Sequence, residues 1–230
     1  MTTSQLPAAI LFDLDGTLVD SEPLWSASER AMADRHGSRW TEDDARSTIG
    51  KPLAVTIAEM RALGLPLSAE AALDDLVGVM VDHHRDGVTW MPGVEALLAT
   101  VRAAQVPAAI VSASYRRLID AVLAAAPAAV FSESVAGDEV HANKPEPEPY
   151  LTAAERLGVP IADCLVIEDS VSGATAGVTA GAHVLVVPSS LAQLDEFERL
   201  GVSLADSLER IGIDELARLR AGERLRLGVA

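Results

Sequence analysis

The alternation of apolar and polar positions along the chain predicts short buried strands separated by amphipathic helices. Continuous apolar runs occur at residues 8–12, 108–111, 164–167 and 184–187. Runs this short are typical of strands buried on both faces, and they cannot cross a membrane. A less regular run at 130–136 can hold a further strand, whereas 184–187 is the last clear one.

Residues 20–88 repeat a helical spacing of apolar positions and contain no run that favours a strand. We predict four consecutive helices here. Beyond residue 89, apolar runs alternate with helical spacings, which predicts an α/β fold with a mainly parallel sheet and helices on both faces. The predicted architecture is a Rossmann-like parallel-sheet core, residues 1–19 and 89–230, with a small helical cap domain, residues 20–88, inserted after the first strand.

Polar residues at three predicted helix starts can accept hydrogen bonds from the first free backbone N–H groups. Ser21 precedes the first helix of the insert, and Ser170 precedes a helix that ends near Gly181. The segment 41–44, Thr-Glu-Asp-Asp, resembles a capping box. We therefore expect helices to begin at these three places.

The chain is strongly acidic, with a formal net charge of −16 over 230 residues. Nucleic acids and anionic membranes both require a basic face, so we expect neither as a partner. A small phosphorylated metabolite stays compatible with this charge, because a few local cations suffice to bind it. Hydrophobic residues make up 49% of the chain and aromatic residues only 3%, which predicts a core of Ala, Val, Leu and Ile.

Several other features predict structure but no chemistry. Cys164, the only cysteine, lies in an apolar run and is expected to be a buried, inert thiol. His83 and His84 are adjacent and cannot share one helix face, so we expect them to be solvated. The first residues lack a basic segment and a long apolar stretch, which favours a cytoplasmic protein without a signal peptide or membrane span. Four arginines are expected on a solvated helix or frayed end: Arg218, Arg220, Arg224 and Arg226.

The main chemical signal is the pair Asp13 and Asp15 directly after the first strand. Strand periodicity puts both carboxylates on the same side. Two converging acids are costly to bury unless a cation lies between them, and oxygen ligands favour Mg²⁺. A hairpin with an Asp-Gly turn is the alternative, but the residues that follow have a helical pattern. Ser112, Glu168 and Asp169 also lie at the ends of predicted strands, where ligands bind in open α/β sheets.

This set of side chains suits phosphoryl transfer. Asp13 is the candidate nucleophile, which would form an aspartyl-phosphate. Asp15 is the candidate acid for the leaving group and then the base for the attacking water. Ser112 would donate a hydrogen bond to the phosphate, and Lys144 would neutralise the charge that develops on its oxygens.

The expected magnesium ligands are the acids at the strand ends: Asp13, Asp15, Glu168 and Asp169. Because adjacent residues of a strand point in opposite directions, one acid of the second pair would bind the metal directly, and we favour Asp169. Thr17, which offers a hydroxyl and an N–H group, and Ala113 are further candidates for contact with the phosphate.

The candidate residues occur along the chain in the same order as the four motifs of the haloacid dehalogenase-like hydrolase superfamily, and they resemble those motifs. The segment 13–17, Asp-Leu-Asp-Gly-Thr, is similar to the first motif, Ser112 to the second, Lys144 to the third and the acids at 168–169 to the fourth. The resemblance spans residues 8–188. It implies magnesium dependence, an aspartyl-phosphate intermediate and a helical cap that closes over the substrate.

Three further segments, 20–24, 91–94 and 144–147, are similar to the branch that holds sugar-phosphate phosphatases and β-phosphoglucomutase. True dehalogenases lack the second acid of the first motif, so the presence of Asp15 argues against dehalogenation. In this family the backbone carbonyl of the same residue is an expected metal ligand.

Three positions depart from the β-phosphoglucomutase pattern. Those enzymes carry a histidine on the first cap helix, where this chain has Trp25. They carry a cap arginine after a glycine-rich turn, where this chain offers Lys51 and Leu53, and a lysine after the second motif, where Tyr115 stands. These departures favour hydrolysis over a mutase reaction.

The predicted function is that of a magnesium-dependent phosphatase for a small phosphomonoester, with a sugar or sugar-alcohol phosphate as the expected class. A phosphosugar mutase is the close alternative. A signalling receiver domain with a phosphorylated aspartate is disfavoured, because such a domain needs no insert at 20–88. A binding protein without catalytic activity is disfavoured, because the acid pair Asp13 and Asp15 is intact. We expect the protein to be a monomer. The side chains expected to contact the leaving group are Glu22, Trp25, Gly50 and Lys51. Arg116 or Arg117 is a candidate for holding a distal group of the substrate.

Overall fold

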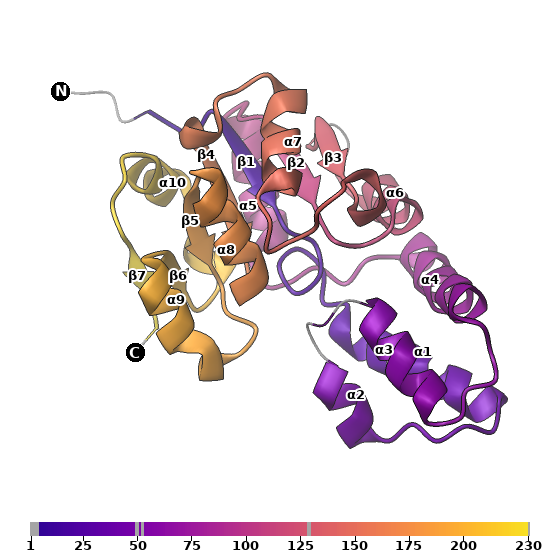
Figure 1. The fold of residues 1–230 in the computed structure, drawn as a ribbon. Helices are drawn as coiled ribbons and strands as arrows, with labels where there is room; N and C mark the ends of the chain where they lie inside the picture. Colours follow the sequence, from indigo (N-terminus) through magenta and orange to yellow (C-terminus); the bar gives the residue numbers. More distant parts are fainter. Residues whose placement is uncertain (1–4, 49–50, 52, 128–129, 230) are drawn as a thin grey trace.

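The computed structural model describes residues 5–48, 51, 53–127 and 130–229. Among them, a seven-stranded sheet has the order β3-β2-β1-β4-β5-β6-β7, and all its neighbouring strands are parallel (Figure 1). This confirms the predicted α/β fold with a Rossmann-like parallel sheet. The strands are β1 Ala9–Phe12, β2 Ala108–Val111, β3 Glu133–Val135, β4 Cys164–Glu168, β5 His183–Val186, β6 Ser203–Ala205 and β7 Arg226–Leu227.

The central strands are apolar throughout because helices cover both faces of the sheet. Ile10 and Phe12 of β1 pack into one apolar cluster, and Ala9 and Leu11 pack into the other. Helices α5, α6 and α10 contribute to the first cluster, and α7, α8 and α9 to the second. These helices are α5 Val94–Ala103, α6 Arg116–Ala125, α7 Glu148–Leu157, α8 Val171–Ala180, α9 Leu194–Leu200 and α10 Ile213–Arg220. Short 3₁₀ helices lie at Gly137–Glu139, Ile161–Asp163, Leu191–Gln193 and Leu208–Arg210.

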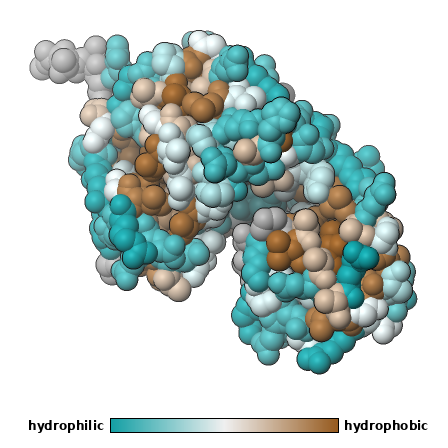
Figure 2. All heavy atoms as spheres, viewed as in Figure 1, coloured by the Kyte–Doolittle hydropathy of each residue, from teal (hydrophilic) through white to brown (hydrophobic). Residues whose placement is uncertain are grey.

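Among the described residues between β1 and α5, four α-helices lie in the segment 20–88 that we call the cap. They are α1 Glu22–Arg35, α2 Glu42–Thr48, α3 Leu53–Ala62 and α4 Ala69–Asp86. No strand occurs among the cap residues that the structure describes. The cap has an apolar cluster of its own, which includes Met32, Trp40 and Met60. Figure 2 shows a notch between the cap and the part of the molecule that carries the sheet.

Helix α4 joins the cap to the sheet-bearing part by packing against α6. Met80 of α4 lies in an apolar cluster with Leu118 and Ala121 of α6. An ion pair between Arg117 Nη2 and Asp74 Oδ1, at 2.8 Å, spans the same contact. The arginine that was a candidate for a distal substrate group is therefore paired with the cap.

Two strands, β6 and β7, were not predicted, so the interpretation of 184–187 as the last strand was wrong. Both strands are very short and begin with a polar residue, which hides the apolar signal of a buried strand. The prediction of a solvated helix or frayed end for the terminal arginines is right for Arg218, an exposed residue of α10, and wrong for Arg226, which lies in β7. Arg220 pairs with Asp163, and Arg224 pairs with Glu198 at 2.6 Å, so both are tied to the rest of the fold.

All three predicted helix starts are confirmed, because α1, α2 and α8 begin directly after Ser21, Thr41 and Ser170. The predicted side-chain capping bond forms at Thr41 and Ser170 and is absent at Ser21. The N–H of Asp44 donates to Thr41 Oγ1 at 3.2 Å while the N–H of Thr41 donates to Asp44 Oδ2 at 2.8 Å, which is a capping box. Ser170 Oγ accepts the N–H three residues on, at 3.0 Å. Ser21 makes no side-chain capping bond, because its hydroxyl donates to Asp15 Oδ1 at 2.6 Å.

The expectation that both adjacent histidines are solvated was wrong for His84, which is 3% exposed, while His83 is exposed. His84 lies four residues after Met80 and seven after Val77, so it continues the buried face of α4.

The expectation for the cysteine is confirmed. Cys164 is buried, and burial raises the pKa of its thiol to about 11, as expected for an inert cysteine. Within the described ranges, no helix combines the length and the apolar character that crossing a membrane requires.

Candidate active site

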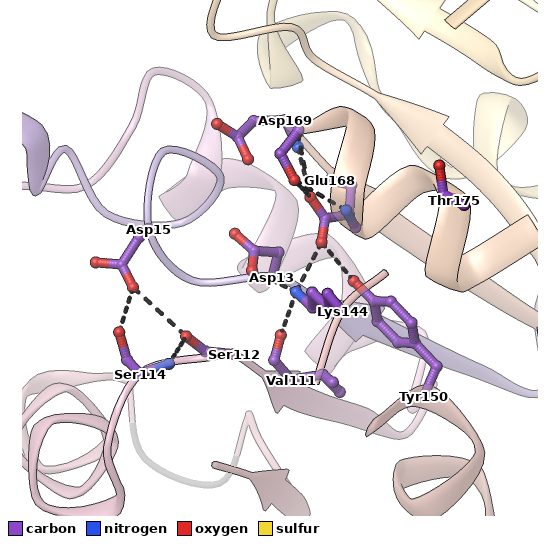
Figure 3. A network of polar contacts seen from close by, with 12 residues as sticks. Asp13, Asp15, Val111, Ser112, Ser114, Lys144, Tyr150, Glu168, Asp169 and Thr175 are labelled. Atoms are coloured by element: carbon purple, nitrogen blue, oxygen red, sulfur yellow. Dashed lines mark hydrogen bonds and ion pairs between the residues drawn. The ribbon is translucent and has the colours of Figure 1, made fainter. Parts of the chain in front are cut away.

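The candidate site lies at the carboxyl ends of β1, β2 and β4, in the middle of the sheet. Asp13 follows β1, Ser112 follows β2, and Glu168 ends β4 with Asp169 directly after it (Figure 3). Parallel strands end at one edge, so these side chains converge as the sequence predicts. Among the described residues, one group of acids, histidines or cysteines is placed to hold a metal ion. It comprises Asp13, Glu168 and Asp169, whose ligand atoms lie within 4.8 Å of one another.

Lys144 enters the same site from the loop before α7. Its Nζ donates to Asp13 Oδ1 at 2.6 Å, to Glu168 Oε1 at 2.7 Å and to the carbonyl oxygen of Val111 at 2.9 Å. Burial alone would lower the pKa of Lys144, but the charges of Asp13 and Glu168 outweigh burial and raise it. The lysine is thus a fixed cation beside the candidate nucleophile.

The acids carry more negative charge than this one lysine balances. Burial and the charge of Glu168 raise the pKa of Asp13 to about 7. Burial, with the charges of Asp13 and Glu168, raises the pKa of Asp169 well above its ordinary value. An excess of buried negative charge is costly. Both the oxygen donors and the uncompensated charge fit a hard divalent cation such as Mg²⁺.

Glu168 and Asp169 differ in how far their carboxylates are already engaged. Glu168 Oε1 accepts from Lys144 and from the hydroxyl of Tyr150, each at 2.7 Å. Its Oε2 accepts from the N–H groups of Asp169 and Ser170 and from the Ser170 hydroxyl, at 3.0–3.2 Å. The lone pairs of Glu168 are therefore largely taken by protein donors.

The side chain of Asp15 lies in a second polar group, apart from the three clustered acids (Figure 3). Its Oδ2 accepts from Ser114 Oγ at 2.7 Å and Ser112 Oγ at 3.4 Å. Its Oδ1 accepts from Ser21 Oγ at 2.6 Å and Trp25 Nε1 at 3.3 Å. Asp15 thus joins the loop after β2 to the first turn of α1. Neither Ser114 nor Ser21 was predicted to make this contact.

Two glycines leave room for the acids of the fourth motif. Gly16 has a φ of +83°, and a Cβ on it would lie 2.5 Å from Asp169 Oδ2. A Cβ on Gly173, in the first turn of α8, would lie 1.6 Å from Glu168 Oε1. The role of Gly173 was not predicted, although a glycine inside an otherwise regular helix signals a close approach.

The two remaining candidates for phosphate contact lie near this edge of the sheet. Thr17 is 2% exposed, and its Oγ1 has no hydrogen-bond partner among the described residues. Ala113 is exposed between Ser112 and Ser114. Contact of Thr17 or Ala113 with phosphate stays a prediction.

Glu22 and Trp25, two of the cap candidates, lie beside Asp15 at the start of α1. The indole N–H of Trp25 contacts Asp15, as described above. Burial and the charges of Asp15 and Asp20 raise the pKa of Glu22. The first turn of α1 thus lies next to Asp15, the candidate acid and base.

The other cationic candidates are engaged elsewhere. Lys51 pairs with Glu59 at 3.3 Å within the cap. Arg116 pairs with Glu139 of the 3₁₀ helix after β3 at 2.7 Å. Gly50 lies outside the described residues. Among the described residues, neither Lys51 nor Arg116 makes a hydrogen bond or ion pair with the acid cluster.

Comparison with known proteins shows which family the chain belongs to. A family model described as haloacid dehalogenase-like hydrolase matches residues 10–187. The chain belongs to this family. The assignment made from the four motifs is thereby confirmed, and the chain is a hydrolase of this family.

Individual relatives indicate which kinds of enzyme in this family the chain resembles. The chain is 33% identical to hexitol phosphatase A of Escherichia coli over 208 residues, which cover 88% of this chain and 92% of that protein. It is 32% identical over 188 residues to the bifunctional riboflavin kinase/FMN phosphatase of Arabidopsis thaliana, with 80% of this chain covered. The match spans only 49% of that longer protein.

Among solved structures, a mutant CbbY from Rhodobacter sphaeroides in complex with xylulose-(1,5)bisphosphate has a TM-score of 0.81. The two chains are 26% identical, and the match covers 92% of this chain and 99% of the other. The solved structure confirms the predicted fold class.

Proposed function

We propose that this chain is a magnesium-dependent phosphatase that hydrolyses a small sugar or sugar-alcohol phosphomonoester through an aspartyl-phosphate on Asp13. The observation that carries the proposal is the buried cluster of three acids around Lys144 at the carboxyl edge of the sheet. The relatives support the class of substrate, since one is a hexitol phosphatase and a similar structure holds a sugar bisphosphate.

Asp13, Asp169 and the backbone carbonyl of Asp15 would hold Mg²⁺, because the carboxylate of Glu168 is occupied by five protein donors. When bound, the metal would neutralise charge on the acids and on the phosphate. This arrangement supports Asp169 as the direct ligand of the fourth motif and gives Glu168 the role of counter-ion for Lys144.

The reaction would proceed in two displacements at phosphorus. A carboxylate oxygen of Asp13 attacks phosphorus, and the bond between phosphorus and the leaving oxygen breaks. Asp15 protonates that leaving oxygen as an acid. It then takes a proton from the water that attacks the aspartyl-phosphate, which releases inorganic phosphate and restores Asp13. Lys144 and Ser112 stabilise the charge on the phosphate oxygens.

The cap would supply the contacts to the leaving group. Trp25 and Ser21 of the cap bond to Asp15, so a leaving group that reaches Asp15 also meets the first turn of α1. Glu22 lies beside them and can accept hydrogen bonds from the hydroxyl groups of a sugar.

The test is a phosphate-release screen over many phosphomonoesters, with Mg²⁺ and with a chelator. The proposal predicts release from sugar or sugar-alcohol monophosphates that requires Mg²⁺. Release that persists undiminished in the chelator would contradict the metal requirement. Conversion of a sugar phosphate into an isomer without free phosphate would instead assign a mutase.

A further inference from the structure

Tyr150 is a fully buried polar residue that the mechanism above does not use. It lies on α7, six residues after Lys144, and its ring packs in the apolar cluster on one face of the sheet. Its hydroxyl donates to Glu168 Oε1 at 2.7 Å, the same oxygen that accepts from Lys144 Nζ at 2.7 Å. Lys144 Nζ also lies 5.0 Å from the centre of the Tyr150 ring (Figure 3).

We infer that Tyr150 is a positioning residue that keeps Lys144 shared between Glu168 and the nucleophile Asp13, an inference that rests on the proposed function. The hydroxyl occupies one lone pair of Glu168 Oε1 and so competes with Lys144 for that oxygen. The ammonium group then keeps its bond to Asp13, from which it can also reach a phosphate oxygen.

The geometry around Glu168 explains why one hydroxyl has this effect. The carboxylate has no contact with solvent, so only the protein can satisfy its oxygens. Without the hydroxyl, Lys144 would be the only donor left on Oε1 among the residues that the structure describes. A hydrogen bond between charged groups is stronger than one to a neutral donor, so the ammonium would be drawn toward Glu168 and away from Asp13.

Tyr150→Phe separates this role from packing, because the ring is kept and only the hydroxyl is lost. We expect kcat for the best phosphomonoester to fall about tenfold and the affinity for inorganic phosphate, titrated by calorimetry with Mg²⁺ present, to fall about fivefold. The matched control is Ser203→Ala, which removes a buried hydroxyl that accepts the N–H of Leu225 at 3.1 Å on β6. This control should lose stability and keep both kcat and phosphate affinity.

A double-mutant cycle with Glu168→Gln tests the route of the effect. The loss of phosphate affinity caused by Tyr150→Phe should shrink below about twofold when Glu168 is already neutral. Equal losses in both backgrounds would overturn the inference.

Three further outcomes are decisive. Wild-type levels of kcat and phosphate affinity in Tyr150→Phe would overturn the positioning role. An activity loss that follows only the unfolded fraction, measured by circular dichroism, would also overturn it, because it would assign Tyr150 to packing. Failure of the wild-type protein to release phosphate from any monoester would instead contradict the proposed function itself.

Discussion

Gly173→Ala tests whether the position of Glu168 is fixed by the start of α8. The added Cβ would lie 1.6 Å from Glu168 Oε1 and 1.9 Å from its carboxyl carbon, far inside any allowed contact. The carboxylate must therefore move and lose its bonds to Lys144 and Tyr150. Each bond to a charged group contributes about 1.5–3 kcal/mol, while the alanine adds up to about 1 kcal/mol of helix propensity. We expect the free energy of unfolding to fall by about 2–5 kcal/mol.

Urea denaturation followed by circular dichroism measures this change. The control is Gly78→Ala in α4, where an added Cβ meets nothing within 4 Å. That variant should be as stable as the wild type or more stable by up to about 1 kcal/mol. A Gly173→Ala variant with unchanged stability and unchanged phosphate release would refute the view that the close approach of α8 fixes the position of the Glu168 carboxylate.

Three further variants test separate parts of the account. Asp15→Asn should lower phosphate release by roughly 10²–10⁴-fold without unfolding the protein, and a rate near that of the wild type would exclude Asp15 as the acid and base. Trp25→Phe should lower kcat several-fold and leave the affinity for inorganic phosphate unchanged; an equal loss of both would place Trp25 at the phosphate. Burial raises the pKa of Glu29, which accepts a bond from Trp40 at 3.1 Å, from 4.5 to about 7. The folded state thus binds this proton more tightly, and stability should decline as the pH rises from 4.5 to 7. Glu29→Gln should remove that decline and add about 2 kcal/mol at pH 8 in urea titrations, whereas an unchanged pH profile would contradict this reasoning.

Much of the sheet follows from the sequence because its central strands are buried on both faces. Such strands are continuous apolar runs, and β1, β2, β4 and β5 were recognisable for that reason. Strand β3 occupies only Glu133–Val135 within the predicted 130–136. Strands β6 and β7, the last two strands at one end of the sheet, are too short to leave a pattern, and pairing with neighbours defines them.

The site was predictable where function depends on position at a strand end, and less so where it depends on contacts between distant segments. Asp13 and Glu168 were found by that rule. Ser21 was interpreted by its local role as a helix cap, but its hydroxyl is drawn to Asp15 instead. Ser114 reaches the same carboxylate from 99 residues away, and no local spacing encodes that contact.

The most direct test of the central proposal is phosphate release by Asp13→Asn in the presence of Mg²⁺, measured beside the wild type on the best monoester from the screen. An amide cannot act as the nucleophile, so the account predicts release at the background rate from a variant that stays folded by circular dichroism. Release at the wild-type rate by the folded variant would contradict the assignment of Asp13 as the nucleophile.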